Sequence, residues 1–252
     1  METITRKSML YKTGVEYGDY TMNHVQGCAH GCLYPCYAYM MAKRFGKVHS
    51  QEEWCAPKLV SNTLDLLDSE IPRLSGKIKS VQLCFTTDPF MEGYPEVGEM
   101  SIAAMKKINE AGIKCTVLTK GILPRSLEKL SKENEYGITL VSLDEAFREK
   151  YERHTASLQK RLNALKDLHK AGCKTWVSVE PYPTPNIVQQ DLMILLEAVS
   201  FVDRIIFGRM NYNKQVSEYA GHKEFYNDCA TLVSAFCREK GIDLHIKEGT
   251  IS

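Results

Sequence analysis

The segment ASLQKRLNALKDLHKAG at 156–172 runs directly into CKTWVSVE at 173–180, and this pair decides the fold class. The first part is amphipathic at helical spacing, so it predicts a helix. Gly172 stands where that helix would end before the next element, which is the expected C-terminal position for glycine. The second part is a short apolar, β-branched run that predicts a strand. Such helix–strand units build parallel sheets with helices outside.

The same alternation extends along most of the chain. The predicted strands are roughly 19–25, 79–86, 114–119, 137–142, 173–180 and 202–208. The predicted helices are 59–71, 101–112, 156–172 and 187–200, followed by a surface helix at 217–240 and a short DLHIK strand or tail. Six strand units are too few for a closed eight-stranded barrel. We therefore expect an α/β fold, a partial TIM-like (β/α)6 barrel, with a doubly wound sheet as the alternative.

Bulk composition is that of an ordinary globular protein. The chain has 252 residues, of which 44% are hydrophobic and 25% charged, with a net charge of +1. We expect one domain over 1–252, with a core at about 15–210 and a helical and strand extension at about 211–252. The charge gives no reason to expect nucleic acid as a partner. Without a signal-like N-terminus or an apolar run approaching roughly 18 residues, we expect a soluble, cytoplasmic protein with no membrane partner.

Cysteine usage directs attention to one short segment. The chain has nine cysteines, an odd number, and no secretory signal, so a disulfide framework is not expected. Six are scattered singly: Cys55, Cys84, Cys115, Cys173, Cys229 and Cys237. The other three, Cys28, Cys32 and Cys36, lie within nine residues.

Three thiolates suit an iron–sulfur cluster with one open iron, because they are one ligand short of a closed zinc site. Gly27, Gly31 and Pro35 are poor residues for a helix interior, so the segment favours a loop wrapped around a metal group. A zinc site completed by His24 or His30, or three reduced structural cysteines, are the alternatives from spacing alone. For either histidine, hydrogen bonding near the metal is the favoured role over ligation.

Several motifs in order resemble the radical SAM superfamily, specifically its spore photoproduct lyase-like, DNA-repair-photolyase-like group. They are YTMNHVQGC at 20–28, GCAHGCLYPCYAYMMAKR at 27–44, CFTTDPF at 84–90, VLTKG at 117–121 and RHTASLQKRLNALKDLHKAGCKTWVSVEPYPTPN at 153–186. Together they place the resemblance over roughly residues 8–215.

The resemblance implies a radical SAM enzyme with a [4Fe–4S] cluster on Cys28, Cys32 and Cys36. It further implies that the open iron holds the amino and carboxylate groups of S-adenosylmethionine (SAM). One electron from an external reductant of flavodoxin or ferredoxin type then releases methionine and a 5′-deoxyadenosyl radical, which acts on an unidentified substrate. A non-catalytic zinc-binding module and a nucleic-acid modification or repair protein are the alternative functions.

One departure from the superfamily pattern concerns the third cysteine. The family has C-x3-C-x2-C, whereas Pro35 makes this spacing C-x3-C-x3-C. We expect Cys36 to remain a ligand. Pro35 stands where the family has the residue that touches the adenine, so Tyr34, one position earlier, becomes the candidate aromatic.

Polar residues at the carboxyl ends of the predicted strands should line the mouth of the barrel. The resemblance implies SAM contacts by Tyr34, Thr87, Asp88, Lys120, Ser142 and Glu180. Each of three residues also has a simpler alternative without SAM: Asp88 as a turn residue, Lys120 as an exposed lysine and Glu180 as a solvated acid. Asn211, Tyr212 and Asn213 follow the sixth strand and could meet substrate, although turn chemistry also explains the asparagines.

The lyases of this group carry a hydrogen-donating cysteine three residues before the Asp of the second strand end. Counting back from Asp88 reaches Phe85, and Cys84 is one position off. Alternation along a strand would turn Cys84 to the other face. We therefore expect that thymine-dimer repair is not the reaction.

Overall fold

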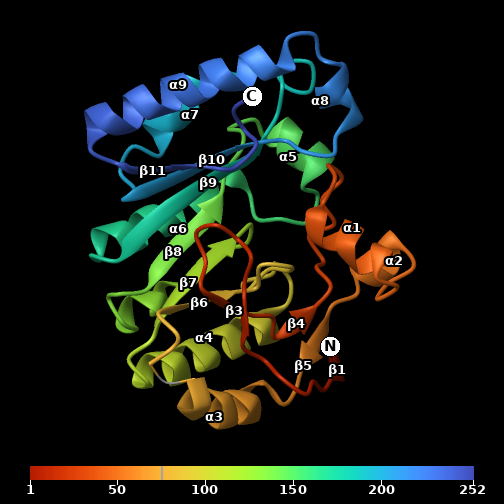
Figure 1. Ribbon diagram of the computed structural model, residues 1–252, viewed down its shortest axis with the longest axis vertical. Helices are drawn as coiled ribbons and strands as arrows, with labels where there is room; N and C mark the ends of the chain where they lie inside the picture. The colour runs from red at the N-terminus through yellow and green to blue at the C-terminus, as the bar shows by residue number, and fades with distance from the viewer. Residues whose placement is uncertain (75) are drawn as a thin grey trace.

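A computed structural model describes residues 1–74 and 76–252 and contains one large sheet of eight strands (Figure 1). The sheet order is β11-β10-β9-β8-β7-β6-β3-β2, and every pairing is parallel except that of β2 with β3. The strands are β2 (Tyr11–Lys12), β3 (Tyr20–Met22), β6 (Ser80–Leu83), β7 (Lys114–Thr119), β8 (Glu135–Thr139), β9 (Lys174–Tyr182), β10 (Arg204–Arg209) and β11 (Asp243–Ile246).

Strand order distinguishes the two predicted architectures. From β6 to β11 each strand lies beside the next one in sequence, so the order never reverses at a switch point as it does in a doubly wound sheet. The two ends of the strand order, β2 and β11, are not paired with each other, which confirms the open, partial barrel.

Helices follow the strands and cover the outer face of the sheet. They are α3 (Thr63–Leu74), α4 (Pro95–Glu110), α5 (Glu145–Tyr151), α6 (Leu158–Lys170), α7 (Leu192–Ala198), α8 (Lys214–Glu218) and α9 (His222–Lys240), with a 3-10 turn at Arg125–Lys129 between β7 and β8. Alternate strand residues such as Val117, Ile138 and Val177 are fully buried in the core beneath these helices. The intervening residues therefore face the barrel interior.

Element boundaries differ from the prediction where local signals were short. Residues 58–60 form β5 (Lys58–Val60) of a second sheet with β1 (Glu2–Ile4) and β4 (Val25–Gln26), so the predicted helix at 59–71 begins later. The predicted helix at 101–112 starts at Pro95 instead, because proline suits a first helical turn. The predicted helix at 217–240 is two helices, separated at Gly221 with its φ of 75°.

Two short helices interrupt the path between β4 and β5. They are α1 (Tyr37–Arg44) and α2 (Gln51–Trp54), and Ser50 caps α2 by accepting from the Glu53 N–H. Figure 1 shows both projecting at one side of the barrel. The three clustered cysteines lie in the loop that leads into α1.

The loop between β2 and β3 crosses the open side of the barrel. Glu16 accepts hydrogen bonds from the Glu248 N–H and lies 3.1 Å from His245 Nε2. Tyr17 packs edge-on against Phe85, Trp176 and His245. The two unpaired edges are thus bridged by side chains rather than by a strand ladder. Among the described residues, no helix is both long and apolar enough to cross a bilayer.

Candidate functional site

The cysteine loop is held in a compact path by backbone geometry. Gly27 and Gly31 have φ values of 86° and 57°, in the left-handed region that favours glycine. A Cβ on Gly27 would lie 2.6 Å from the carbonyl oxygen of Trp54, and the Cys28 N–H donates to that same oxygen at 2.9 Å. The loop is therefore fixed against the end of α2.

The three thiols lie close enough to influence one another. Burial raises the pKa of Cys28 above its usual range, and the neighbouring Asp88 and Cys32 raise it further. Burial also raises the pKa of Cys32 to about 12, and Lys120 opposes this shift. Thiolates bind metal, so an added positive charge is what would deprotonate these groups.

Neither nearby histidine has a free ring nitrogen to complete a zinc site. His24 is fully buried, with Nε2 at 2.9 Å from Ser101 Oγ and Nδ1 at 3.5 Å from Cys84 Sγ. In His30, Nε2 accepts from the Glu92 N–H, so its proton lies on Nδ1, facing Asp88. Over residues 1–74 and 76–252, no three His, Cys, Asp or Glu side chains are arranged to hold a single metal ion.

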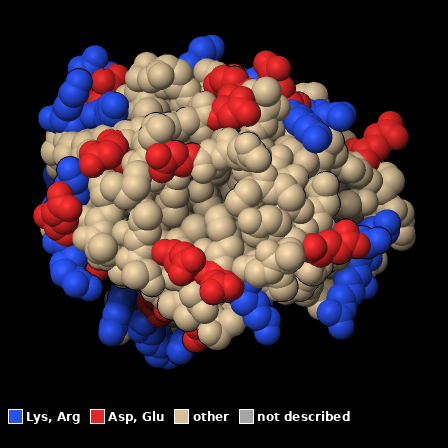
Figure 2. Space-filling view, turned by 90° about the horizontal axis from the view of Figure 1, so that it is seen from above, with Lys and Arg blue, Asp and Glu red and all other residues tan. Residues whose placement is uncertain are grey.

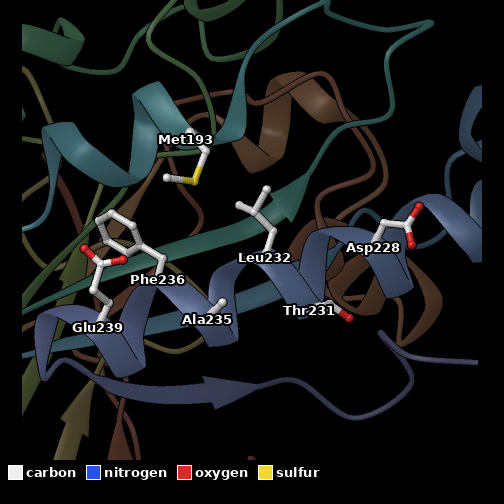
Figure 3. A pocket seen from close by; sticks show the side chains of 7 residues that line it. All are labelled: Met193, Asp228, Thr231, Leu232, Ala235, Phe236 and Glu239. Atoms are coloured by element: carbon white, nitrogen blue, oxygen red, sulfur yellow. The ribbon is translucent and has the colours of Figure 1, made fainter.

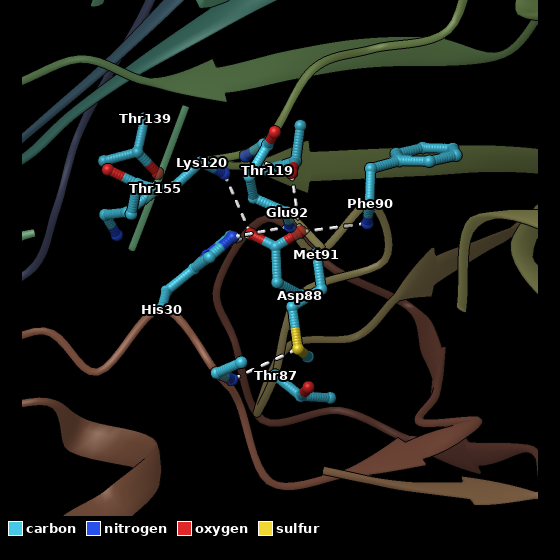
Figure 4. Close-up of polar contacts among 12 residues, drawn as sticks. His30, Thr87, Asp88, Phe90, Met91, Glu92, Thr119, Lys120, Thr139 and Thr155 are labelled. Carbon is cyan, nitrogen blue, oxygen red and sulfur yellow. Dashed lines mark hydrogen bonds and ion pairs between the residues drawn. The ribbon is translucent and has the colours of Figure 1, made fainter. Parts of the chain in front are cut away.

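Asp88 is the hub that joins the cysteine loop to the strand ends (Figure 4). Its carboxylate accepts from the Thr119 hydroxyl at 2.6 Å, from the Lys120 N–H at 2.8 Å and from the Phe90 N–H at 2.9 Å. His30 Nδ1 lies 3.4 Å from the same group. Burial alone would raise the pKa of Asp88, but His30 and these donors hold it below its usual range. Asp88 is therefore a buried anion and not a plain turn residue.

A second buried network joins the loop to α6. The Tyr34 hydroxyl donates to Glu152 at 2.6 Å, and Arg161 Nη2 lies 2.8 Å from the other carboxylate oxygen. Arg161 also donates to the carbonyl oxygens of Ala156 and Thr139. Burial would raise the pKa of Glu152, but Lys120 and Arg161 keep it low, so the acid is ionised.

Sequence reasoning assigned no role to Glu152 or Arg161. The segment quoted for the resemblance begins one residue after Glu152, and a charged residue inside an amphipathic helix usually faces water. A signal was present in the helix pattern. Arg161 occupies a position between Leu158 and Leu165, on the face that packs against the sheet.

Lys120 lies between this network and the cysteines, so it is not the exposed lysine of the ordinary reading. Its Nζ is 5.6 Å from the centre of the Tyr34 ring. Burial would lower the pKa of Lys120, but the adjacent Cys32 and Glu152 hold it above its usual range. The structure therefore brings Tyr34 and Lys120 together beside Cys32.

The other predicted contacts lie at their strand ends with other partners. The Thr87 hydroxyl donates to the Gly27 carbonyl oxygen at 2.7 Å, which tethers the cysteine loop. Ser142 is buried, and its Oγ accepts from the Asp144 N–H. Burial raises the pKa of Glu180, and Lys247, whose Nζ lies 3.7 Å away, opposes the shift.

Phe85 and Cys84 separate at the end of β6. Cys84 has a φ of 58° and is buried beside Val25, Met91 and Val97, next to the cysteine loop. Phe85 packs on Tyr17 in the open side of the barrel. The position three residues before Asp88 therefore presents an aromatic ring. Asn213 caps α8, as turn chemistry anticipates, and Tyr212 is exposed with a φ of 58°.

A hollow of about 340 Å³ lies elsewhere, between α7 and α9 (Figure 3). Met193, Leu232 and Phe236 line it, together with Asp228 and Glu239. No cysteine of the loop and no predicted SAM contact is among its lining residues. It is a surface groove on the helical layer and not part of the site.

The chain is similar to known proteins in both sequence and fold. Residues 22–199 match the family profile described as the radical SAM superfamily. The uncharacterized protein ORF301 of Acidianus two-tailed virus is 29% identical over 216 residues, covering 80% of this chain and 70% of that protein. The uncharacterized protein MJ0683 of Methanocaldococcus jannaschii is 25% identical over 196 residues, covering 76% of this chain and 70% of that protein.

Among solved structures, a spore photoproduct lyase double mutant with bound AdoMet and dinucleoside spore photoproduct superposes with a TM-score of 0.71. The match covers 96% of this chain and 80% of that chain at 14% identity. A complex of the lyase with dinucleoside spore photoproduct gives a TM-score of 0.70 over the same shares. At this identity the likeness shows the shared fold.

Proposed function

This chain belongs to the radical SAM superfamily, and from that premise we propose that it binds a [4Fe–4S] cluster through Cys28, Cys32 and Cys36 and uses it to cleave SAM. The family match spans 22–199 and so includes the loop, the Asp88 strand end and helix α6 with its buried Arg161. The substrate on which the radical acts is left open.

The single observation that carries the proposal is the composition of the loop site. The three thiols lie close enough for the charge of one to shift the pKa of another. Both nearby histidines are hydrogen-bonded to other groups, His30 to the Glu92 N–H and His24 to Ser101. The donor set is thus sulfur only, which fits iron–sulfur ligation better than a completed zinc site.

When bound, a cluster held by Cys28, Cys32 and Cys36 would supply the one-electron reduction by which SAM is cleaved to methionine and a 5′-deoxyadenosyl radical. The protein positions SAM and excludes competing reactions. Lys120 supplies a buried ammonium beside Cys32, suited to pairing with the SAM carboxylate. Tyr34 offers an aromatic face beneath that ammonium, and Glu152 fixes its hydroxyl.

Asp88 and Thr87 act on the loop. Asp88 accepts a hydrogen bond from the backbone N–H of Lys120 and contacts His30, so it holds the end of β7 and the cysteine loop together. We expect the SAM amino group to bind beside it. Thr87 holds Gly27, one residue before the first cysteine. Ser142 and Glu180 extend the polar mouth along the ends of β8 and β9, and Glu180 lies within the field of Lys120.

Nucleic-acid modification remains the second candidate only because of the fold shared with spore photoproduct lyase. Net charge is +1, and on the face seen in Figure 2 acidic and basic side chains are intermingled around the margin. Phosphate binding depends on a field of positive charge. The charge of the protein therefore does not favour nucleic-acid modification as its function.

Anaerobic reconstitution tests the proposal. Purified protein treated with iron and sulfide should hold about four irons per chain, and reduction with dithionite in the presence of SAM should release 5′-deoxyadenosine. A Cys32→Ala variant should lose both, whereas Cys173→Ala, remote from the loop at the start of β9, should keep both. Zinc without iron in anaerobically purified protein, or a full cluster in Cys32→Ala, would contradict the assignment.

A further inference from the structure

A second hollow, of about 230 Å³, lies on the outer side of the cysteine loop. Its walls come from α1, from the turn that follows it, from β4 and from Trp54. Tyr37, Met41 and Phe45 give it an apolar and aromatic lining, and Arg6 and Lys47 add positive charge.

One layer of side chains separates this hollow from the first cysteine. Ala42, Val48 and Trp54 line the hollow and form a small buried cluster, and Cys28 packs against that same cluster from the other side. The Cys28 N–H donates to the Trp54 carbonyl oxygen at 2.9 Å. Gly27, immediately before Cys28, also lines the hollow. An occupant of this surface would lie next to the metal ligands.

The surface around the hollow is unusually apolar for a short exposed helix. Phe45 is 65% exposed and Tyr37 56% exposed, and Leu33 and Met40 are exposed as well. These four large apolar side chains fall within 13 residues of loop and helix. Exposed apolar residues that gather in this way mark interaction sites more often than scattered ones do.

The charged residues that line the hollow, and those of α1 and the turn after it, are basic. Residues 37–50 include Lys43, Arg44 and Lys47 and no Asp or Glu. The described residues that line the hollow include two cations, Arg6 and Lys47, and no acid. The next acids along the chain are Glu52 and Glu53, and the Glu53 carboxylate is engaged by the His49 N–H at 2.7 Å. An apolar hollow with cations in its lining fits an acidic partner with an apolar centre.

We propose that this surface, formed by Leu33, Tyr37, Met40 and Phe45 with Arg6, Lys43, Arg44 and Lys47 around them, docks a small acidic one-electron carrier protein. The inference rests on the proposed function, which requires an electron from outside. The carrier loses one electron, and the metal group beside Cys28 gains it; no atom or proton needs to be transferred.

Binding can be measured without turnover. Isothermal titration of the protein with purified flavodoxin should give a Kd that weakens as salt rises, because charged rims contribute through screened attraction. The Lys43→Glu/Lys47→Glu variant should weaken this Kd at least tenfold, and Phe45→Ser should weaken it through lost apolar contact. Lys223→Glu, an exposed lysine on α9, is the matched control and should bind as the unaltered protein does.

A parallel assay separates this inference from the proposed function. Dithionite needs no docking surface, so dithionite-driven release of 5′-deoxyadenosine should be equal in all four proteins, while flavodoxin-driven release falls in the two surface variants. Unchanged flavodoxin affinity in those variants would overturn the docking surface alone. A change in self-association by the same variants, seen by light scattering, would overturn it in favour of contact between copies of this chain. No product with dithionite in the unaltered protein would instead defeat the proposed function, and with it the inference.

Discussion

The hydroxyl of Tyr34 donates to the carboxylate of Glu152 across 118 positions of sequence, at a distance of 2.6 Å. This bond joins the cysteine loop to the segment before α6, and Arg161 neutralises the acid from the other side. The pair places a charged group against the loop at a position for which the sequence predicted no role.

Glu152→Gln should destabilise the fold by about 3 kcal/mol, because removing one member of a buried ion pair leaves the other charge uncompensated. Arg161 is 0% exposed and has no route to water. Urea unfolding measures the change. Glu149→Gln, at an exposed pair with Arg148, should alter stability by less than about 0.5 kcal/mol. Equal effects in the two variants would refute the buried network.

His24 should make stability depend on pH above the carboxylate range. Burial lowers its pKa to about 4 from 6.5, so the unfolded chain binds a proton between these values that the folded chain does not. Stability from this residue is therefore complete above pH 6.5 and is lost as pH falls, by roughly 2 kcal/mol at pH 5.

Urea unfolding of cluster-free protein at pH 7 and pH 5 measures this loss. His24→Gln should remove the difference, and His49→Gln, at an exposed position, should retain it. A pH difference that survives in His24→Gln would assign the effect to other groups.

Gly27→Ala should disturb the loop more than a conformational penalty alone would. The added Cβ would meet the Trp54 carbonyl oxygen at 2.6 Å, in addition to adopting a positive φ. Gly46 also has a positive φ but nothing within 4 Å of its would-be Cβ, so Gly46→Ala isolates the conformational cost of about 1–2 kcal/mol. We expect Gly27→Ala to exceed that cost and to retain less iron after reconstitution. Similar values for the two variants would show that the loop is not held against α2.

Lys120→Gln should weaken SAM binding by at least about tenfold, because a charge-assisted hydrogen bond contributes roughly 1.5–3 kcal/mol. Equilibrium binding of SAM to the reconstituted protein is the measurement, with iron content checked first. Lys106→Gln on the exposed face of α4 serves as the control. An unchanged SAM affinity in Lys120→Gln would place the ammonium away from the ligand.

The open barrel was predictable because its units repeat a local pattern. Each β-branched run from β6 to β10 is followed by a longer amphipathic or turn segment, and Gly112 and Gly172 mark two helix ends with φ values of 74° and 75°. The small sheet of β1, β5 and β4 was not predictable, since its strands have two or three residues and no period can be read from them.

The cysteine loop was found from spacing, but its supporting contacts were not. Asp88 was predicted at a strand end, yet its hold on His30 joins residues 58 positions apart and depends on how the loop folds back. Glu152 and Arg161 form a buried ion pair, but the helical pattern at 156–172 begins after Glu152 and so gave no sign of it. Local motifs identified the candidate functional residues. Tertiary contacts determine which of these side chains are already hydrogen-bonded and which are available to a ligand.

The contact between Glu16 and the Glu248 N–H spans 232 positions, nearly the whole polypeptide. During synthesis Glu16 emerges long before Glu248. The contact between them can therefore form only after β11 has been made and has paired with β10. Until then the Tyr17 ring cannot pack against His245, and this side of the barrel interior stays open to water. The side-chain contacts that bridge the two edges of the sheet therefore form only after the last strand has been made.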